Sequence, residues 1–268
     1  MLADILLYLL LCVSAIGAGV INALAGGGTL LTFPALLWAL AGRGAAAGVL
    51  ANATSTVALV PGSLAGAWCY RRELAGTGPW LRLLFWPSLA GGLVGSWLLI
   101  VLPDTWFQLL IPWLLLTAAL LFLVQPALTR WLKTHSGGGL PSVGLCVLLV
   151  FMQFLVAVYG GYFGAGIGIL MLTALALMGM GDIHRMNAVK SLLAAVINGV
   201  SVLVFVGSGK VEWTYAPVMA VAAVAGGYLG AHFGRRLPSA LVRWTVILIG
   251  FGLAAYYFWR QMGVGSAA

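Results

Sequence analysis

Long apolar runs, interrupted by short stretches rich in charged residues, glycine or proline, dominate the sequence. A helix needs about 20 apolar residues to cross a bilayer, so these runs predict a series of membrane helices. The predicted segments are residues 3–24, 29–41, 44–69, 80–101, 106–128, 142–163, 167–180, 183–207, 213–234 and 238–259. The segments 29–41 and 167–180 are short for a full crossing. The pattern predicts an all-α polytopic membrane protein with broken or half-spanning helices.

Two halves of the chain align with each other at an offset of 135 positions. This offset places NATS (52–55) on NAVK (187–190), AGGLVGS (90–96) on AGGYLGA (225–231) and LPDTW (102–106) on LPSAL (237–241). The glycine-rich breaks before the two short segments align at a slightly larger offset. We interpret the chain as a duplication, with a first repeat over 1–128, a flexible cytoplasmic linker over 129–141 and a second repeat over 142–262. Five segments per repeat make the second copy inverted, as in many secondary transporters.

The basic residues predict the orientation of the chain in the membrane. With the N-terminus outside, the cytoplasmic side receives Arg71, Arg72, Arg82, Arg130, Lys133, Arg185, Arg235 and Arg236, and the other side receives Arg43, Lys210 and Arg260. Cytoplasmic loops carry an excess of Lys and Arg. We therefore expect a multi-pass protein of the cell inner membrane with both termini on the non-cytoplasmic side. The sequence leaves open whether the short segments cross fully or turn back as re-entrant hairpins.

Composition supports this interpretation and excludes several classes of function. Of the 268 residues, 63% are hydrophobic and 7% are charged, whereas about a quarter of the residues in a soluble domain are charged. The net charge of +8 comes mainly from residues between the apolar segments, so the bilayer is the expected partner and nucleic acid is not. Motifs for metal binding, haem attachment or nucleophilic catalysis are absent from the sequence. We expect neither an enzyme nor a bound cofactor or metal.

The two glycine-rich breaks are the first candidate for a binding site. A helix that begins inside the membrane has a partial positive charge and unpaired N–H groups at its N-terminus, which favour an anion. The expected anion site consists of Gly26, Gly27, Gly28 and Thr29 from one break and of Gly164, Ala165, Gly166 and Gly168 from the other. The competing explanation is close packing of helices at small residues.

Lys190 is the second candidate, because it lies about seven residues inside a predicted helix. A charge at the centre of a bilayer costs at least about 2.5 kcal/mol and is usually functional or paired. The nearest acidic residue in the sequence is Asp182, near the membrane interface. An anionic substrate would supply the missing partner, whereas the alternative is a lysine that extends to the cytoplasmic headgroups.

Uncharged polar residues in apolar helices complete the predicted site. Amides and hydroxyls can donate hydrogen bonds to an oxyanion, and the candidates are Asn22, Asn52, Thr54, Ser55, Tyr162, Asn187 and Ser191. Hydrogen bonds between helices, or back to the carbonyls of the same helix, are the alternative roles.

The stretch 17–37 (GAGVINALAGGGTLLTFPALL), together with 159–172 (YGGYFGAGIGILML) and 181–199 (GDIHRMNAVKSLLAAVING), resembles the sulfite exporter TauE/SafE family, also called the toluene sulfonate uptake permease family. The resemblance implies a secondary transporter of small anions, such as sulfite, sulfonates or related organic anions. One position breaks the symmetry of the two repeats. The first repeat has the neutral Ser55 there, and the second has the positively charged Lys190. A passive anion channel and an auxiliary membrane subunit remain alternative interpretations, and the sequence does not determine whether the protein forms a homodimer.

Overall fold

The computed structural model describes residues 2–24, 26–135, 143–180, 182–233 and 239–265. Within these ranges the chain forms α1 (Leu2–Leu24), α2 (Thr29–Ala39), α3 (Ala47–Cys69), α4 (Gly78–Val101), α5 (Asp104–His135), α6 (Val143–Tyr162), α7 (Ile167–Leu177), α8 (Ile183–Gly207), α9 (Ala216–Phe233) and α10 (Ser239–Gly265). Two 3-10 helices, η1 (Ala41–Ala46) and η2 (Arg71–Leu74), flank α3. The predicted all-α architecture is confirmed, and each predicted segment corresponds to one α-helix.

Five of the described helices are long and apolar enough to cross a membrane. They are Asp4–Ala23, Ala41–Cys69, Gly78–Val101, Asp104–Ala127 and Ile183–Gly207. Many large apolar side chains on the outside remain exposed, including Trp38, Trp86 and Trp259. Exposed apolar surface of this extent suits a protein whose surroundings are lipid.

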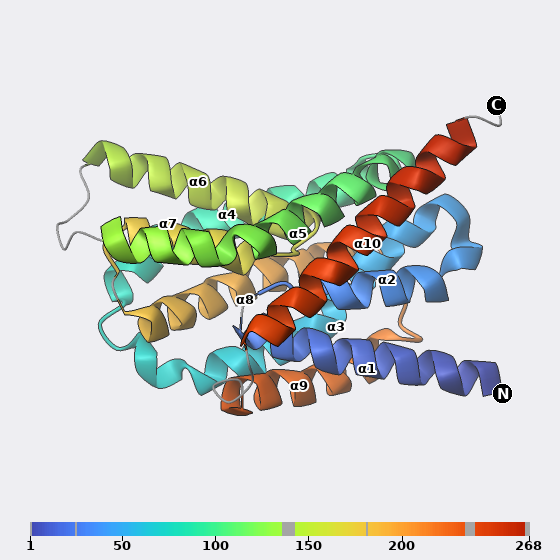
Figure 1. Ribbon diagram of the computed structural model, residues 1–268, viewed down its shortest axis with the longest axis horizontal. Helices are drawn as coiled ribbons and strands as arrows, with labels where there is room; N and C mark the ends of the chain where they lie inside the picture. Colours follow the sequence, from blue (N-terminus) through green and yellow to red (C-terminus); the bar gives the residue numbers. More distant parts are fainter. Residues whose placement is uncertain (1, 25, 136–142, 181, 234–238, 266–268) are drawn as a thin grey trace.

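The two short helices turn back toward the side from which the chain came. Figure 1 shows α1 running from the end that carries both termini to the middle of the molecule, and α2 returning toward that end. In the same way, α6 enters from the opposite end and α7 returns to it. Each short helix has 11 residues, about 17 Å, which is roughly half the thickness of the bilayer core. Each short helix therefore reverses the direction of the helix before it, and by itself it is too short to cross the bilayer core.

The connection between the halves differs from the predicted flexible linker. Helix α5 continues to His135, so the first seven residues of the predicted linker, 129–135, are helical. No glycine or proline occurs between Pro126 and Ser136, and the good helix formers in this stretch extend α5. The rest of the predicted linker, 136–141, lies outside the described residues.

Helices from the two halves interlock instead of forming separate bundles. Helix α1 packs against α9, and α6 packs against α4. Helix α3 also contacts α9, and α8 also contacts α4. Helices α3 and α8 contact each other at the centre, and α5 contacts α10. Each contact between α1 or α3 and α9 has a counterpart between α6 or α8 and α4, in which each helix is replaced by the one five positions away in the chain.

Glycines permit the closest of these helix contacts. A Cβ atom on Gly62 of α3 would overlap the carbonyl oxygen of Ala223 in α9, and one on Gly227 of α9 would overlap the carbonyl oxygen of Gly62. On the other side of the molecule, a Cβ on Gly95 of α4 would overlap the carbonyl oxygen of Val158 in α6. At these three positions, therefore, glycine serves helix packing.

Gly62→Ala is expected to lower the free energy of unfolding by about 1–3 kcal/mol, the usual cost of overpacking a close contact. Gly199→Ala is the matched control, because a Cβ at Gly199 of α8 would meet open space. Thermal unfolding of the purified protein in detergent measures the difference. Equal unfolding temperatures for the two variants would contradict the packing role of Gly62.

Candidate functional site

The first break is held open by an amide of the preceding helix. Gly26 adopts a left-handed backbone with φ of +71°, and α2 begins three residues later at Thr29. The Oδ1 atom of Asn22 accepts hydrogen bonds from the backbone N–H groups of Gly27 at 3.0 Å and Gly28 at 2.8 Å. The side chain of Asn22 therefore satisfies two of the donors that a helix N-terminus leaves unpaired.

Asn22→Ala is expected to lower the free energy of unfolding by about 0.5–2 kcal/mol, because it removes the acceptor of these two N–H groups. Asn22→Asp keeps an oxygen acceptor at the same position and serves as the matched control. Denaturant unfolding followed by intrinsic fluorescence measures both variants. A loss of stability that is the same for alanine and aspartate would argue against the capping role.

The second break is held by residues from both halves of the chain. Gly164 and Gly166 both have a left-handed backbone, with φ of +84° and +79°, and α7 begins directly after Gly166. The hydroxyl of Tyr159 donates to the carbonyl oxygen of Ala165 at 2.9 Å. From α3 in the first half, the amide Nδ2 of Asn52 donates to the carbonyl oxygen of Tyr162 at 2.9 Å. Asn52 therefore connects the first half to the second break.

The two breaks lie against each other. A Cβ atom on Gly26 would lie 3.0 Å from the Cα atom of Gly168, and one on Gly164 would lie 3.7 Å from Oγ1 of Thr29. The positive φ of Gly26 and this close approach both require glycine. As a result, the N-termini of α2 and α7 approach the same region near the middle of the molecule.

A small cavity of about 30 Å³ lies at this meeting point, between the breaks and the helices α3 and α8. Its lining residues are Asn22, Ala23, Gly26, Thr29, Thr56, Leu59, Ser63, Gly164, Ile167, Gly168, Lys190, Ser191, Ala194 and Asn198. Seven of the predicted site residues are among them: Asn22, Gly26, Thr29, Gly164, Gly168, Lys190 and Ser191. The cavity has room for only a few water-sized groups, so it suits a small polar ligand.

Lys190 is the most unusual residue of this cavity. Its side chain is 1% exposed, and Nζ has no hydrogen-bond acceptor among the described residues. The predicted partner Asp182 is engaged at the start of α8, where Oδ1 accepts from the backbone N–H of His184 and Oδ2 lies 3.6 Å from Nε of Arg185. A buried ammonium group without a partner is costly, and a bound anion would offset that cost.

The other nine predicted residues do not line the cavity: Gly27, Gly28, Asn52, Thr54, Ser55, Tyr162, Ala165, Gly166 and Asn187. The N–H groups of Gly27 and Gly28 donate to Asn22, as described above. Ser55 exchanges a hydrogen bond with Thr32 of α2, and the amide of Asn187 donates to the carbonyl oxygen of Ile183 in its own helix. Their polar groups thus fix the breaks and helices around the cavity.

Two of these nine residues have contacts at the edge of the site. The ring of Tyr162 packs against Phe107 of α5, with 5.6 Å between the ring centroids. Thr54 faces the connection between α8 and α9, where its Oγ1 accepts from the backbone N–H of Glu212 at 2.9 Å. Both residues therefore hold neighbouring elements in place around the cavity.

Three polar lining residues were not among the predicted set: Thr56, Ser63 and Asn198. A signal for them exists in the sequence, because Thr56 and Ser191 are 135 positions apart, and so are Ser63 and Asn198. The apolar lining residues Leu59 and Ala194 form a third such pair. The repeat offset, applied to Ser191, would have predicted Thr56 as part of the site.

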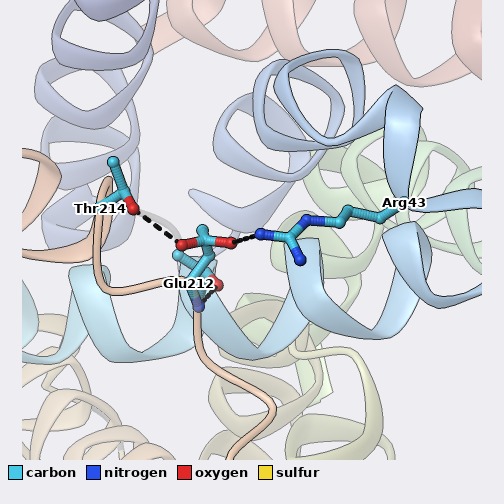
Figure 2. A network of polar contacts seen from close by, with 4 residues as sticks. Arg43, Glu212 and Thr214 are labelled. Carbon is cyan, nitrogen blue, oxygen red and sulfur yellow. Dashed lines mark hydrogen bonds and ion pairs between the residues drawn. The ribbon is translucent and has the colours of Figure 1, made fainter.

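Polar contacts join the two halves at the end of the molecule that carries the termini. Figure 2 shows the carboxylate of Glu212 between Arg43 of η1 and Thr214, with Arg43 Nη2 at 2.7 Å and Thr214 Oγ1 at 2.8 Å. We call Arg43, Thr54, Glu212 and Thr214 the terminal latch. Thr54 belongs to α3, two residues before Thr56 in the cavity wall. Through the terminal latch, the segment between α8 and α9 is therefore bonded to η1 and to α3, which forms one wall of the cavity.

A second ion pair lies at the same end. Nζ of Lys210, which also lies between α8 and α9, is 3.7 Å from Oδ1 of Asp104 at the start of α5. Both side chains are partly exposed, so this pair is weakly stabilising. Two ion pairs therefore tie the connection after α8 to the first half of the chain.

Comparison with known proteins places this fold and cavity in a family. A probable membrane transporter protein of Haemophilus influenzae is 30% identical over 263 residues, which cover 96% of each chain. The probable membrane transporter protein YfcA of Escherichia coli is 28% identical, over 98% of this chain and 93% of the relative. The probable membrane transporter protein ORF9 of Sinorhizobium is 25% identical over 94% and 93% of the two chains. No solved structure matches the chain.

The family model described as sulfite exporter TauE/SafE matches residues 11–257, which include every residue that lines the cavity. The resemblance that the glycine-rich breaks and the Asn-containing helices indicate is therefore confirmed over nearly the whole sequence. The chain belongs to the sulfite exporter TauE/SafE family of membrane proteins.

Proposed function

We propose that this membrane transporter moves small anions, with sulfite, sulfonates or related organic anions as substrates, by alternating access. The observation that carries this proposal is the buried and unpartnered ammonium group of Lys190 at the cavity. Because no described residue supplies a counter-charge, an anion that enters from solution is the partner that lowers the energy of this charge.

The other groups of the cavity favour an oxyanion. Thr29, Ser191 and Asn198 can donate hydrogen bonds into the cavity, and α2 and α7 direct the positive ends of their dipoles toward it. A sulfite or sulfonate group carries three oxygen acceptors on one sulfur atom, so it can accept from several of these donors at once. The family description supports sulfur oxyanions within this chemical class.

The arrangement of the halves supports alternating access. Helices α2 and α7 begin near the middle of the molecule, and we interpret the chain as two repeats of opposite orientation, which is a recurring transporter plan. The terminal latch gives one end of the molecule a set of contacts that can break and re-form, while the site stays in place. Motion of one half against the other would then expose the cavity to each side in turn.

We propose an orientation with both termini on the non-cytoplasmic side of the inner membrane. Arg71, Arg72 and Arg185 lie at the end opposite the termini, where the start of α8 contacts η2. Arg235 and Arg236, which belong to the same predicted cytoplasmic set, lie outside the described residues. The excess of basic residues at this end supports its placement in the cytoplasm.

The function is tested with purified protein in liposomes and radiolabelled sulfite. A carrier is expected to show saturable uptake that is accelerated by unlabelled sulfite on the opposite side of the membrane. Uptake without this acceleration would indicate a passive channel. Absence of flux, with correctly folded protein in the liposomes, would favour the auxiliary subunit and contradict the proposed function.

A further inference from the structure

Two oppositely charged side chains lie on neighbouring elements at the end opposite the termini, without forming an ion pair. Glu73 belongs to η2, between α3 and α4, and Arg185 belongs to the first turn of α8. Helix α8 contacts η2, and a Cβ atom on Gly76 would lie 3.8 Å from Nη1 of Arg185. The guanidinium group of Arg185 therefore lies beside the connection that carries Glu73.

The carboxylate of Glu73 is not satisfied. Its Oε2 atom is buried and has no hydrogen-bond partner, and the ion pairs among the described residues include none with Glu73. A buried carboxylate oxygen without a partner is costly. Arg185 could offset this cost with little loss, because its present partner Asp182 is 3.6 Å away and both side chains of that pair are about half exposed.

The terminal latch shows the same arrangement in a closed form. Arg43 lies just before α3 and Glu212 lies just after α8, and their side chains are 2.7 Å apart. At the opposite end, Arg185 lies at the start of α8 and Glu73 lies just after α3. The same kinds of residue therefore occupy corresponding places, with the two halves of the chain exchanged, as inverted repeats predict.

One difference between the two ends favours the pair that is formed. Thr54 of α3 accepts a hydrogen bond from the backbone N–H of Glu212 at 2.9 Å. The residue 135 positions later, on α8, is Val189, whose side chain has no acceptor. The terminal latch therefore has a hydrogen bond that a pair at the opposite end would lack, and this bond stabilises the conformation that the structure shows.

We propose that Glu73 and Arg185 form a second latch, the opposite latch, which closes the end opposite the termini when the terminal latch opens. The inference rests on the proposed function, because alternating access requires the two ends to close in turn. The structure then represents the conformation that is closed at the terminal end, and the opposite latch stabilises the other conformation. Removal of the opposite latch therefore shifts the protein further toward the conformation closed at the terminal end.

The test uses the full-length protein in liposomes, in a background without the three native cysteines. It measures how fast an impermeant maleimide, applied at the end that carries the termini, labels Thr56→Cys in the cavity. Glu73→Gln and Arg185→Gln are each expected to lower the labelling rate by up to about fivefold, the effect of one partly exposed ion pair. The exchanged pair, Glu73→Arg together with Arg185→Glu, is expected to restore the rate.

Asp182→Asn is the matched control. It removes the present partner of Arg185, and asparagine keeps an oxygen that can accept from the N–H of His184. We expect this variant to raise the labelling rate, because Arg185 is then free to pair with Glu73. A rate that Asp182→Asn lowers as much as Arg185→Gln does would indicate a structural effect at the start of α8 and would contradict the opposite latch.

An unchanged or higher rate in Glu73→Gln, or a rate that the exchanged pair does not restore, would also show that the opposite latch is wrong. In that case, saturable sulfite uptake by the native protein, accelerated by sulfite on the other side of the membrane, would still support the proposed function. Absence of flux with folded native protein would contradict the proposed function and the inference together.

Discussion

Lys190→Met is expected to lose anion binding and to unfold at a higher temperature than the native protein when no anion is present. Methionine has nearly the same length as lysine but carries no charge, so the variant removes a buried cation that has no partner in the described structure. A lysine at the centre of a membrane helix costs at least about 2.5 kcal/mol, and removing this cost accounts for the expected gain in stability. The loss of one hydrogen bond to a charged group lowers anion affinity at least about tenfold.

Thermal unfolding with and without sulfite measures both effects, because a ligand that binds the native state raises its apparent stability. Lys210→Met is the control: it removes a lysine that is partly exposed at the terminal end, and it is expected to keep the response to sulfite. Near-normal sulfite transport by Lys190→Met would contradict the central role of the charge.

Glu212→Gln is expected to increase the accessibility of the cavity from the end that carries the termini. The substitution weakens the 2.7 Å ion pair with Arg43 and keeps the backbone hydrogen bond to Thr54. An ion pair that is partly exposed contributes about 0.2–1 kcal/mol, so the population open at this end should rise by up to about fivefold. The rate at which an impermeant maleimide labels Thr56→Cys from that side, in a background without Cys12, Cys69 and Cys146, measures the change.

Asp104→Asn provides the matched comparison for Glu212→Gln. It weakens the longer 3.7 Å ion pair between Asp104 and Lys210 at the same end. Unlike Glu212, neither of these residues is hydrogen-bonded to Thr54 of α3. We expect a smaller increase in labelling from this variant. An unchanged labelling rate in Glu212→Gln would exclude the terminal latch as a contact that closes this end.

The helical segments and the two breaks could be predicted from the sequence because their causes are local. Apolar length and the position of glycine determine where a membrane helix begins and ends. The predicted start of α8 agrees with the structure at Ile183, and the starts of α2 and α7 agree at Thr29 and Ile167. The extension of α5 to His135 was missed because a polar composition was interpreted as a linker, although every residue from Ala127 to His135 can continue a helix.

The candidate site could be predicted only in part, because its geometry depends on contacts between distant residues. Lys190 and the glycines next to the cavity follow from the cost of a buried charge and from the need for a break. Whether an asparagine faces a ligand or a backbone group depends on a partner far away in the sequence. Asn52 donates to the carbonyl oxygen of Tyr162, 110 positions later, and nothing near Asn52 in the sequence indicates this bond.

Helix α1 contacts α9 more extensively than it contacts α2 or α3 of its own half, and this has a consequence for how the protein is made. During synthesis, α1 and α2 leave the ribosome long before α9. The face of α1 that carries Gly19, whose Cβ would overlap the carbonyl oxygen of Ala223 in α9, therefore has no final partner until most of the chain has been inserted. A chain that stops after α5 would leave this face open to membrane chaperones and proteases. Assembly of the first half therefore waits for the second, and the protein is expected to mature as one unit and not half by half.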